Sequence, residues 1–243
     1  MTGGSAGIGA VVADRLAAEG ARVVVVSRSG SAPSGCSGVV ADLAVAGAPE
    51  RAVQAAVERL GGLDILVNNV GVAHQVAFAE LRDDDWQASF DLNLMSYVRS
   101  IRAALPALRA SDQPRIVNVS SSAGKRPSAA MPDYSVMKAA VLSLSRLIAD
   151  VEAGNGVLCN AVCPGPARTP AWLAAGGLAD QAAERAGTDR STVLQKVGAG
   201  RPLGRLADPD EIASVIVFLC SARASYVTGA AWSADGGTVP IIL

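Results

Sequence analysis

A tyrosine and a lysine in this sequence are spaced so that they can share one proton-transfer site. Tyr134 and Lys138 are four residues apart, so on a helix their side chains point the same way, one turn from each other. Pro132 and Asp133 suit the first turn of such a helix. A phenol has a pKa of about 10, and proton exchange near neutral pH requires a shift of about three units, roughly 4 kcal/mol. A lysine cation one turn away can supply part of that shift, although the spacing alone also fits a surface tyrosine and a solvated lysine.

Three consecutive serines offer hydroxyl groups that could work with this pair. Ser120, Ser121 and Ser122 lie at the end of the apolar run 115–120, which we predict to be a strand. Open α/β sheets bind their ligands at the carboxyl ends of the strands. A hydroxyl at this position can therefore hydrogen-bond a carbonyl or alkoxide oxygen.

The start of the sequence is a glycine-rich turn that suits a phosphate group. Residues Thr2 to Gly9 read Thr-Gly-Gly-Ser-Ala-Gly-Ile-Gly, and a helical pattern covers 7–20. Such a turn places backbone N–H groups and a helix N-terminus against phosphate, and its glycines let the backbone come close. Taken alone, the pattern also fits a plain structural turn.

Apolar runs alternate with helical patterns along the whole chain. Continuous Val/Ile runs are typical of parallel strands that are covered on both faces. The alternation therefore predicts an α/β fold with a doubly wound parallel sheet in a single domain over 1–243. The span from about 170 to 207 breaks the rhythm, and we expect short helices there that form a substrate lid. The predicted strands are 22–27, 38–41, 63–68, 115–120, 157–162 and 230–234, and the predicted helices are 7–20, 49–61, 83–109, 133–153 and 208–222.

Composition and charge exclude several classes of function. The chain has 243 residues, 50% of them hydrophobic and 18% charged, so a folded domain is expected. A net charge of −1 does not provide the basic face that nucleic-acid binding needs, and a single histidine argues against a His-rich metal site. The four cysteines form no CxxC motif, and no apolar run approaches the roughly 20 residues of a membrane span. No export signal is recognisable either, so we expect a cytoplasmic protein with no metal, nucleic acid or membrane as partner.

Taken in order, the motifs resemble the classical branch of the short-chain dehydrogenase/reductase family. The resemblance extends from Thr2 to Gly237. It implies a Rossmann-like fold and a hydride transfer between a nicotinamide cofactor and a carbonyl or alcohol. The motifs are the Thr-Gly-x-x-x-Gly-x-Gly loop, Asn68-Asn69-Val70-Gly71, Ser121, Tyr134-x-x-x-Lys138 and Pro164-Gly165.

The resemblance assigns a role to each catalytic candidate. Tyr134 would give or take the proton, and Ser121, thirteen residues before it, would hold the substrate oxygen. Lys138 would depress the pKa of Tyr134 and hold the nicotinamide ribose. Asn93, on the long preceding helix, would hold a water that relays protons to the lysine. Asn93 alone also fits a polar residue on a helix face.

The resemblance also implies a cofactor site, with NADP(H) preferred and NAD(H) possible. In this family an acidic residue at the end of the second strand selects NAD(H). Here Ser27 and Arg28 occupy that position, and a guanidinium can pair with a 2′-phosphate. Asp42 could face the adenine or simply form a turn. The implied cofactor-binding residues are Thr2, Gly3, Ser5, Gly7, Ile8, Gly9, Ser27, Arg28, Asp42, Leu43, Asn69, Val70, Gly71, Tyr134, Lys138, Pro164, Gly165 and Thr169.

The substrate is less well defined than the cofactor. The resemblance covers β-ketoacyl-[acyl carrier protein] reductases, hydroxysteroid dehydrogenases and sugar or polyol dehydrogenases, and an NADP(H) preference favours reduction of a ketone. Relatives form tetramers, so we expect a homotetramer or homodimer, with the apolar tail 239–243 as a subunit contact. The alternative is a dinucleotide-binding protein of the same fold without turnover, in a regulatory or structural role.

One family feature is not found in the sequence. Family members have a central strand directly before the glycine loop, whereas this sequence begins at the loop. The two flanking strands would then lose their common neighbour, and each stranded buried backbone group costs about 1–3 kcal/mol. Either the true start lies upstream, or the chain folds as written with a gap in its sheet.

Overall fold

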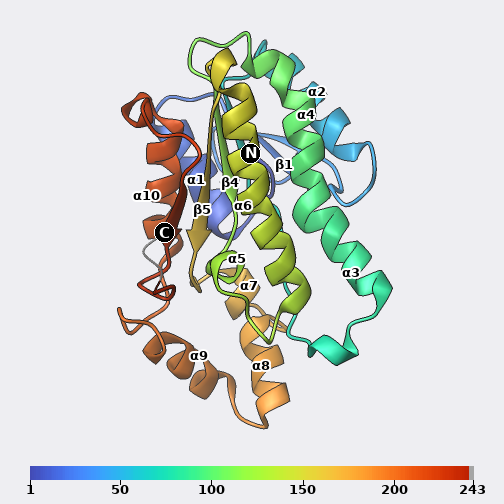
Figure 1. Ribbon diagram of the computed structural model, residues 1–243, viewed down its shortest axis with the longest axis vertical. Helices are drawn as coiled ribbons and strands as arrows, with labels where there is room; N and C mark the ends of the chain where they lie inside the picture. Colours follow the sequence, from blue (N-terminus) through green and yellow to red (C-terminus); the bar gives the residue numbers. More distant parts are fainter. Residues whose placement is uncertain (241–243) are drawn as a thin grey trace.

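The computed structural model describes residues 1–240 and confirms the predicted α/β class (Figure 1). The strands pair in parallel, β1 with β2 in one group and β3-β4-β5-β6 in another. Predicted and observed strand bounds agree to within about two residues. The strands are β1 (Val24–Ser27), β2 (Ser37–Val40), β3 (Ile65–Asn68), β4 (Arg115–Val119), β5 (Leu158–Pro164) and β6 (Ala231–Ala234).

Helices cover both faces of these strands. α1 and α10 pack on each other and on one face, while α2, α4 and α6 cover the other (Figure 1). Each face has its own hydrophobic core. Successive strand side chains point to opposite faces, so Val117 packs in the core beneath α1 and α10, whereas Ile116 packs in the core on the α4 side. The helices are α1 (Gly7–Ala18), α2 (Ala48–Leu60), α3 (Asp83–Phe90), α4 (Ser96–Leu108), α5 (Ser122–Lys125), α6 (Pro132–Glu152), α7 (Pro170–Leu173), α8 (Leu178–Ala186), α9 (Arg190–Ala199) and α10 (Pro209–Cys220).

The predicted helix 83–109 is not one regular helix, which corrects that prediction. It consists of α3, a π-helical turn over Asp91–Met95, and α4. A π-helical turn changes the register of the side chains, and such turns are frequent at functional sites. Asn93 lies within this turn, and Tyr97 is the second residue of α4, just after it.

Residues 1–3 lie between β1 and β3, where the missing strand was expected. Thr2 forms a parallel bridge with Val26, and its N–H donates to the carbonyl of Val67 at 2.9 Å. The N–H of Gly3 donates to the carbonyl of Val26 at 2.8 Å. β1 and β3 do not pair directly with each other, as predicted. These few bonds nevertheless hold the start of the glycine loop on both sides.

The segment predicted as a lid contains α7, α8 and α9. α8 and α9 pack on each other around Ala179, Ala183 and Val193. In the tail predicted as a subunit contact, residues 241–243 lie outside the described residues. Within 1–240, no helix combines the length and apolarity that a membrane span needs, and no group of three or more His, Cys, Asp or Glu could hold a metal ion.

Candidate active site

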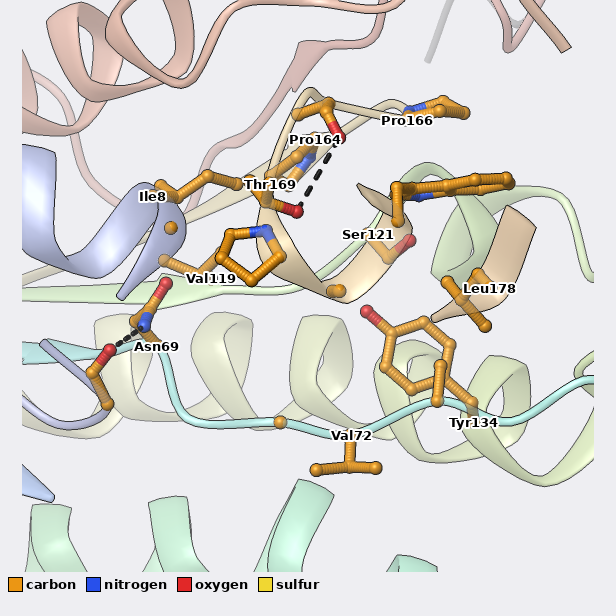
Figure 2. Close-up of a pocket in the computed structure, with 18 of the residues that line it drawn as sticks. Ile8, Asn69, Val72, Val119, Ser121, Tyr134, Pro164, Pro166, Thr169 and Leu178 are labelled. Atoms are coloured by element: carbon orange, nitrogen blue, oxygen red, sulfur yellow. Dashed lines mark hydrogen bonds between the residues drawn. The ribbon is translucent and has the colours of Figure 1, made fainter. Parts of the chain in front are cut away.

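A cavity of about 1090 Å³ opens at the carboxyl ends of the strands. Its wall includes Ser27 at the end of β1, Asn69 after β3, Ser121 after β4 and Pro164 at the end of β5. Ligands of open α/β sheets bind at this edge, because loops from several strands converge there. Figure 2 shows Tyr134 and Ser121 in this cavity together with the cavity-facing residues Ile8 and Asn69.

The glycine loop forms one end of the cavity and fits a phosphate group. Gly3 and Gly7 have positive φ angles of 63° and 56°, which glycine adopts without strain. A Cβ atom on Gly9 would lie 2.3 Å from the carbonyl oxygen of Gly3 and 2.6 Å from the side-chain nitrogen of Asn69. No side chain caps the N-terminus of α1, because Ala6 occupies the N-cap. Its first N–H groups are therefore available to an anion.

The segment after β3 is held in place by residues behind the cavity wall. The hydroxyl of Thr2 accepts hydrogen bonds from the N–H groups of Asn69 at 2.9 Å and Val70 at 3.3 Å. The amide of Asn69 in turn donates to the carbonyl of Gly3 at 3.1 Å. Within the described residues, Thr2 is not part of the cavity lining. Its hydroxyl instead holds the segment after β3, which does line the cavity.

Asn93 holds the same segment from the other side. Its Oδ1 accepts from the N–H of Val72 at 3.0 Å, and its Nδ2 donates to the carbonyl of Val72 at 3.0 Å and to the hydroxyl of Ser89 at 3.1 Å. The side chain is buried, and Asn93 does not line the cavity within 1–240. A Cβ on Gly71 would lie 2.9 Å from Asn93 Oδ1 and 3.3 Å from Nζ of Lys138, so both groups adjoin Gly71.

Tyr134 and Ser121 bring two hydroxyl groups to one part of the cavity (Figure 2). Ser121 is the N-cap of the short helix α5, and its oxygen accepts from the N–H of Ala123 at 3.1 Å. This bond leaves the proton of the Ser121 hydroxyl free to be donated. Ser120 is different, because its hydroxyl donates to the carbonyl of Lys138 at 2.7 Å. The structure thus distinguishes Ser121 from Ser120 by the hydrogen bonds of their hydroxyl groups, although both residues line the cavity.

Burial raises the pKa of the Tyr134 phenol above its usual value, and the Ser121 hydroxyl opposes the shift. That Lys138 lowers this pKa during the reaction stays a prediction. Burial lowers the pKa of the Lys138 amine to about 7, so near neutral pH the amine carries only part of a positive charge. Its Nζ lies 5.7 Å from the centre of the Tyr134 ring and hydrogen-bonds elsewhere. Tyr134 is thus a protonated phenol at neutral pH, the form that a proton donor requires.

The predicted site residues come together almost completely. All the predicted cofactor residues except Thr2 line this cavity, as does Ser121. Sequence reasoning missed Tyr97, a buried side chain whose phenol oxygen accepts a hydrogen bond from Lys138 at 2.9 Å. A signal was available, because Tyr97 is four residues after Asn93 and belongs to the same helical stretch.

Comparison with known proteins decides the family. The family described as "Enoyl-(Acyl carrier protein) reductase" matches residues 3–239. The chain is also 35% identical to the short-chain reductase protein NovJ of Streptomyces niveus, over 98% of this chain and 92% of that protein. The chain belongs to the short-chain dehydrogenase/reductase family.

Other short-chain dehydrogenases/reductases are similar over nearly their full length. The 3-oxoacyl-[acyl-carrier-protein] reductase FabG of Vibrio cholerae is 32% identical, over 98% of this chain and 95% of that protein. The structure of L-sorbose reductase from Gluconobacter frateurii, solved with NADPH and L-sorbose, has a TM-score of 0.89 and 32% identity, covering 100% of this chain and 96% of that one. These matches place the chain among NAD(P)-dependent oxidoreductases.

In this short-chain dehydrogenase/reductase, the far end of the cavity is formed by the turns after β1 and β2. Ser27 and Arg28 line it on one side, and Asp42 and Leu43 on the other. The Ser27 hydroxyl accepts from the N–H of Gly30 at 3.0 Å, which shapes the turn that carries Arg28. Arg28 is exposed and forms no ion pair within residues 1–240. Asp42 accepts from the N–H of Ala44 at 3.1 Å, so it does form the turn that the sequence left as an alternative.

The loop after β5 closes the cavity next to the glycine loop. Pro164 and Gly165 line it, and the backbone of Asp235 is so close that a Cβ on Gly165 would lie 2.9 Å from the Asp235 Cα. Thr169 is buried, and a Cβ on Gly7 would lie 3.3 Å from the Thr169 Cβ. The loop after β5 and the glycine loop therefore meet over one cavity.

Proposed function

We propose that this chain is an NADP(H)-dependent reductase that converts a ketone to a secondary alcohol, with Tyr134 as the general acid. The observation that carries this proposal is the position of the Tyr134 phenol. It lies beside the Ser121 hydroxyl in the cavity whose other end is the glycine loop. A protonated phenol, a second hydroxyl donor and a phosphate cradle in one cavity are the groups that carbonyl reduction requires.

In this proposal, separate residues bind the substrate oxygen, transfer the proton and bind the cofactor ribose. The Ser121 hydroxyl donates a hydrogen bond to the substrate oxygen and holds that oxygen near Tyr134. Tyr134 then gives its phenol proton to the same oxygen as negative charge develops there. Lys138 borders the cavity beside Gly71, where its amine can bind a ribose hydroxyl and favour the phenolate that remains.

A nicotinamide dinucleotide fits the residues that are present. The uncapped N-terminus of α1 and the close packing around Gly9 support a pyrophosphate there. Asn69, Val70 and Gly71 would line its middle part, and Thr169 would bind the carboxamide end. When bound, the reduced cofactor supplies the hydride that the protein itself cannot provide.

Arg28 is the basis for proposing NADP(H) rather than NAD(H). It is exposed at the cavity end where a 2′-phosphate would lie, and no carboxylate occupies the end of β1. We expect Arg28→Ala to raise the Kd for NADPH about tenfold and to leave that for NADH within about twofold, because only the phosphate contact is lost. Fluorescence titration of both cofactors measures this, with the exposed Arg223→Ala as the matched control. Equal weakening of both cofactors would contradict the assignment.

The proposed substrate is a small or medium-sized ketone held beneath a lid. The lid helices contribute apolar side chains to the cavity, among them Trp172, Leu178 and Val197, and Met131 approaches from the loop before α6. The names of the relatives include reductases of 3-oxoacyl groups and of a ketose, so 3-oxoacyl thioesters and keto sugars are the first compounds to test. We further expect a cytoplasmic protein that forms a homotetramer or homodimer. Light scattering of the purified chain can check the oligomeric state.

The experiment that tests the function is NADPH consumption with a panel of ketones. Oxidation of NADPH together with formation of the matching alcohol is the expected result, and the panel includes 3-oxoacyl thioesters, keto sugars and cyclic ketones. Tight NADPH binding without turnover on any member would favour the alternative, a dinucleotide-binding protein in a regulatory or structural role. The intact set of Asn93, Ser121, Tyr134 and Lys138 favours the enzyme.

A further inference from the structure

Tyr97 is a buried polar side chain to which the proposed reaction has so far assigned no task. Its side chain is 0% exposed. Its hydroxyl donates to the carbonyl oxygens of Val70 and Val119, each at 2.9 Å, and accepts from Nζ of Lys138, also at 2.9 Å. A phenol has a single proton, which these two carbonyls share. The lone pairs of the Tyr97 oxygen are therefore left to face the amine.

The Lys138 amine depends on Tyr97 for its position. Lys138 is 2% exposed, and its other hydrogen bond runs to the carbonyl of Val119 at 2.9 Å, a group that Tyr97 also binds. Nζ lies 4.7 Å from the centre of the Tyr97 ring, closer than the 5.7 Å that separates it from the Tyr134 ring. Within the described part of the chain, Tyr97 is thus the side chain that accepts a hydrogen bond from this amine.

We propose that Tyr97 is a positioning residue for Lys138: its phenol oxygen holds the amine at the cavity wall beside Gly71 and stabilises the protonated amine there. The kinetic consequence rests on the proposed function, whereas the link between Tyr97 and Lys138 does not. A merely structural role would be limited to satisfying the carbonyls of Val70 and Val119. The two roles differ in whether the protonation of Lys138 responds when the Tyr97 hydroxyl is removed.

Beside the Val119 carbonyl, the surroundings leave the Tyr97 hydroxyl as the side-chain group that can stabilise this cation. Burial raises the pKa of Tyr97 well above its usual value, so its oxygen stays a neutral acceptor across the working pH range. The Cys163 thiol on β5 would raise the amine pKa only as a thiolate, and burial raises the pKa of that thiol to about 11, so it too is neutral near pH 7. Asp91 pairs with Arg99 at 3.2 Å. The remaining titratable groups on α6 near Lys138 and on the elements packed against that helix are Asp133, Tyr134, Lys125, Cys159, Asp83, Asp84 and Asp85.

The first test measures the protonation of Lys138 directly in the ligand-free protein. The chain contains three lysines, Lys125, Lys138 and Lys196, so an NMR spectrum of ¹³Cε-labelled lysine has few signals. The signal that is missing in Lys138→Met belongs to Lys138. We expect Tyr97→Phe to lower the titration midpoint of Lys138 by about one pH unit, because the cation loses an acceptor. Tyr226→Phe, at a fully exposed tyrosine, is the matched control and leaves the midpoint unchanged. A folded Tyr97→Phe with an unchanged midpoint would overturn the proposal.

The second test is kinetic and separates positioning from stability. If Tyr97→Phe retains its fold, we expect its kcat to fall about tenfold. We also expect the pH profile of alcohol oxidation to move to higher pH, because the amine no longer favours the Tyr134 phenolate. A lower melting temperature with unchanged kcat and pH profile would indicate a structural role only. If the wild-type chain turns over no substrate, the proposed function fails, and the NMR titration still decides the role of Tyr97.

A measurement on the wild-type protein keeps the proposal testable if Tyr97→Phe does not fold. The chain has three tyrosines, so labelling with 3-fluorotyrosine yields few ¹⁹F signals. We expect the Tyr97 signal to shift as Lys138 titrates near pH 7 and this shift to vanish in Lys138→Met. A Tyr97 signal that does not respond to pH in the wild-type protein would contradict the contact between the two groups.

Discussion

Tyr134→Phe is expected to lower kcat for ketone reduction by about a thousandfold while leaving the fold and NADPH binding intact, since general acids contribute about 10²–10⁴ in rate. The substitution removes the phenol proton but keeps the ring that fills the cavity wall. Initial rates of NADPH oxidation with the best ketone of the panel, together with NADPH titration, measure both effects. Because burial holds Tyr134 protonated, wild-type reduction should be constant around neutral pH, while alcohol oxidation, which needs the phenolate, should rise with pH.

The control for this variant is Tyr226→Phe, which makes the same chemical change at an exposed tyrosine. It should retain wild-type kcat and pH profile. Turnover retained in Tyr134→Phe would remove Tyr134 from the mechanism. A loss of NADPH binding that parallels the loss of rate would show that the variant disturbs the site rather than the proton transfer.

Gly9→Ala is expected to weaken cofactor binding strongly and to destabilise the fold. A Cβ at this position would lie 2.3 Å from the Gly3 carbonyl oxygen, which is backbone and cannot turn away, and 2.6 Å from the Asn69 side chain. Either α1 or the glycine loop must move, and the phosphate cradle moves with it. We expect the Kd for NADPH to rise more than about a hundredfold, equivalent to about 2.8 kcal/mol. Overpacking should also lower the free energy of unfolding by about 1–3 kcal/mol.

Gly154→Ala provides the matched control, because a Cβ there meets nothing within 4 Å. It should leave the Kd for NADPH unchanged and the free energy of unfolding within about 1 kcal/mol of the wild-type value. Thermal unfolding and fluorescence titration of the two variants, side by side, measure the difference. Wild-type NADPH affinity in Gly9→Ala would mean that the glycine loop is not the phosphate site.

Much of the site follows from local patterns in the sequence. The spacing of Tyr134 and Lys138 brings both side chains to one face of any helix. The Val/Ile runs predict strands buried on both faces, and the helical patterns that alternate with these runs supply the helices that cover them. The choice among adjacent serines was different. The sequence offers equivalent hydroxyls at Ser120 and Ser121, and both residues line the cavity, but the packing of α6 decides that the Ser120 hydroxyl is engaged by the Lys138 carbonyl.

The α/β class, the glycine loop and the spacing of Tyr134 and Lys138 could be predicted from the sequence, because each is visible as an apolar run, a glycine pattern or a one-turn spacing within a single element. The contact between Tyr97 and Lys138 could not be predicted in this way and comes from the packing, since the two residues are 41 positions apart and meet where α4 and α6 pack against the strands. The packing also decided the direction of the Tyr134 pKa. Burial raises this pKa against the opposing effect of the Ser121 hydroxyl, and no local pattern encodes which distant segments will bury the phenol.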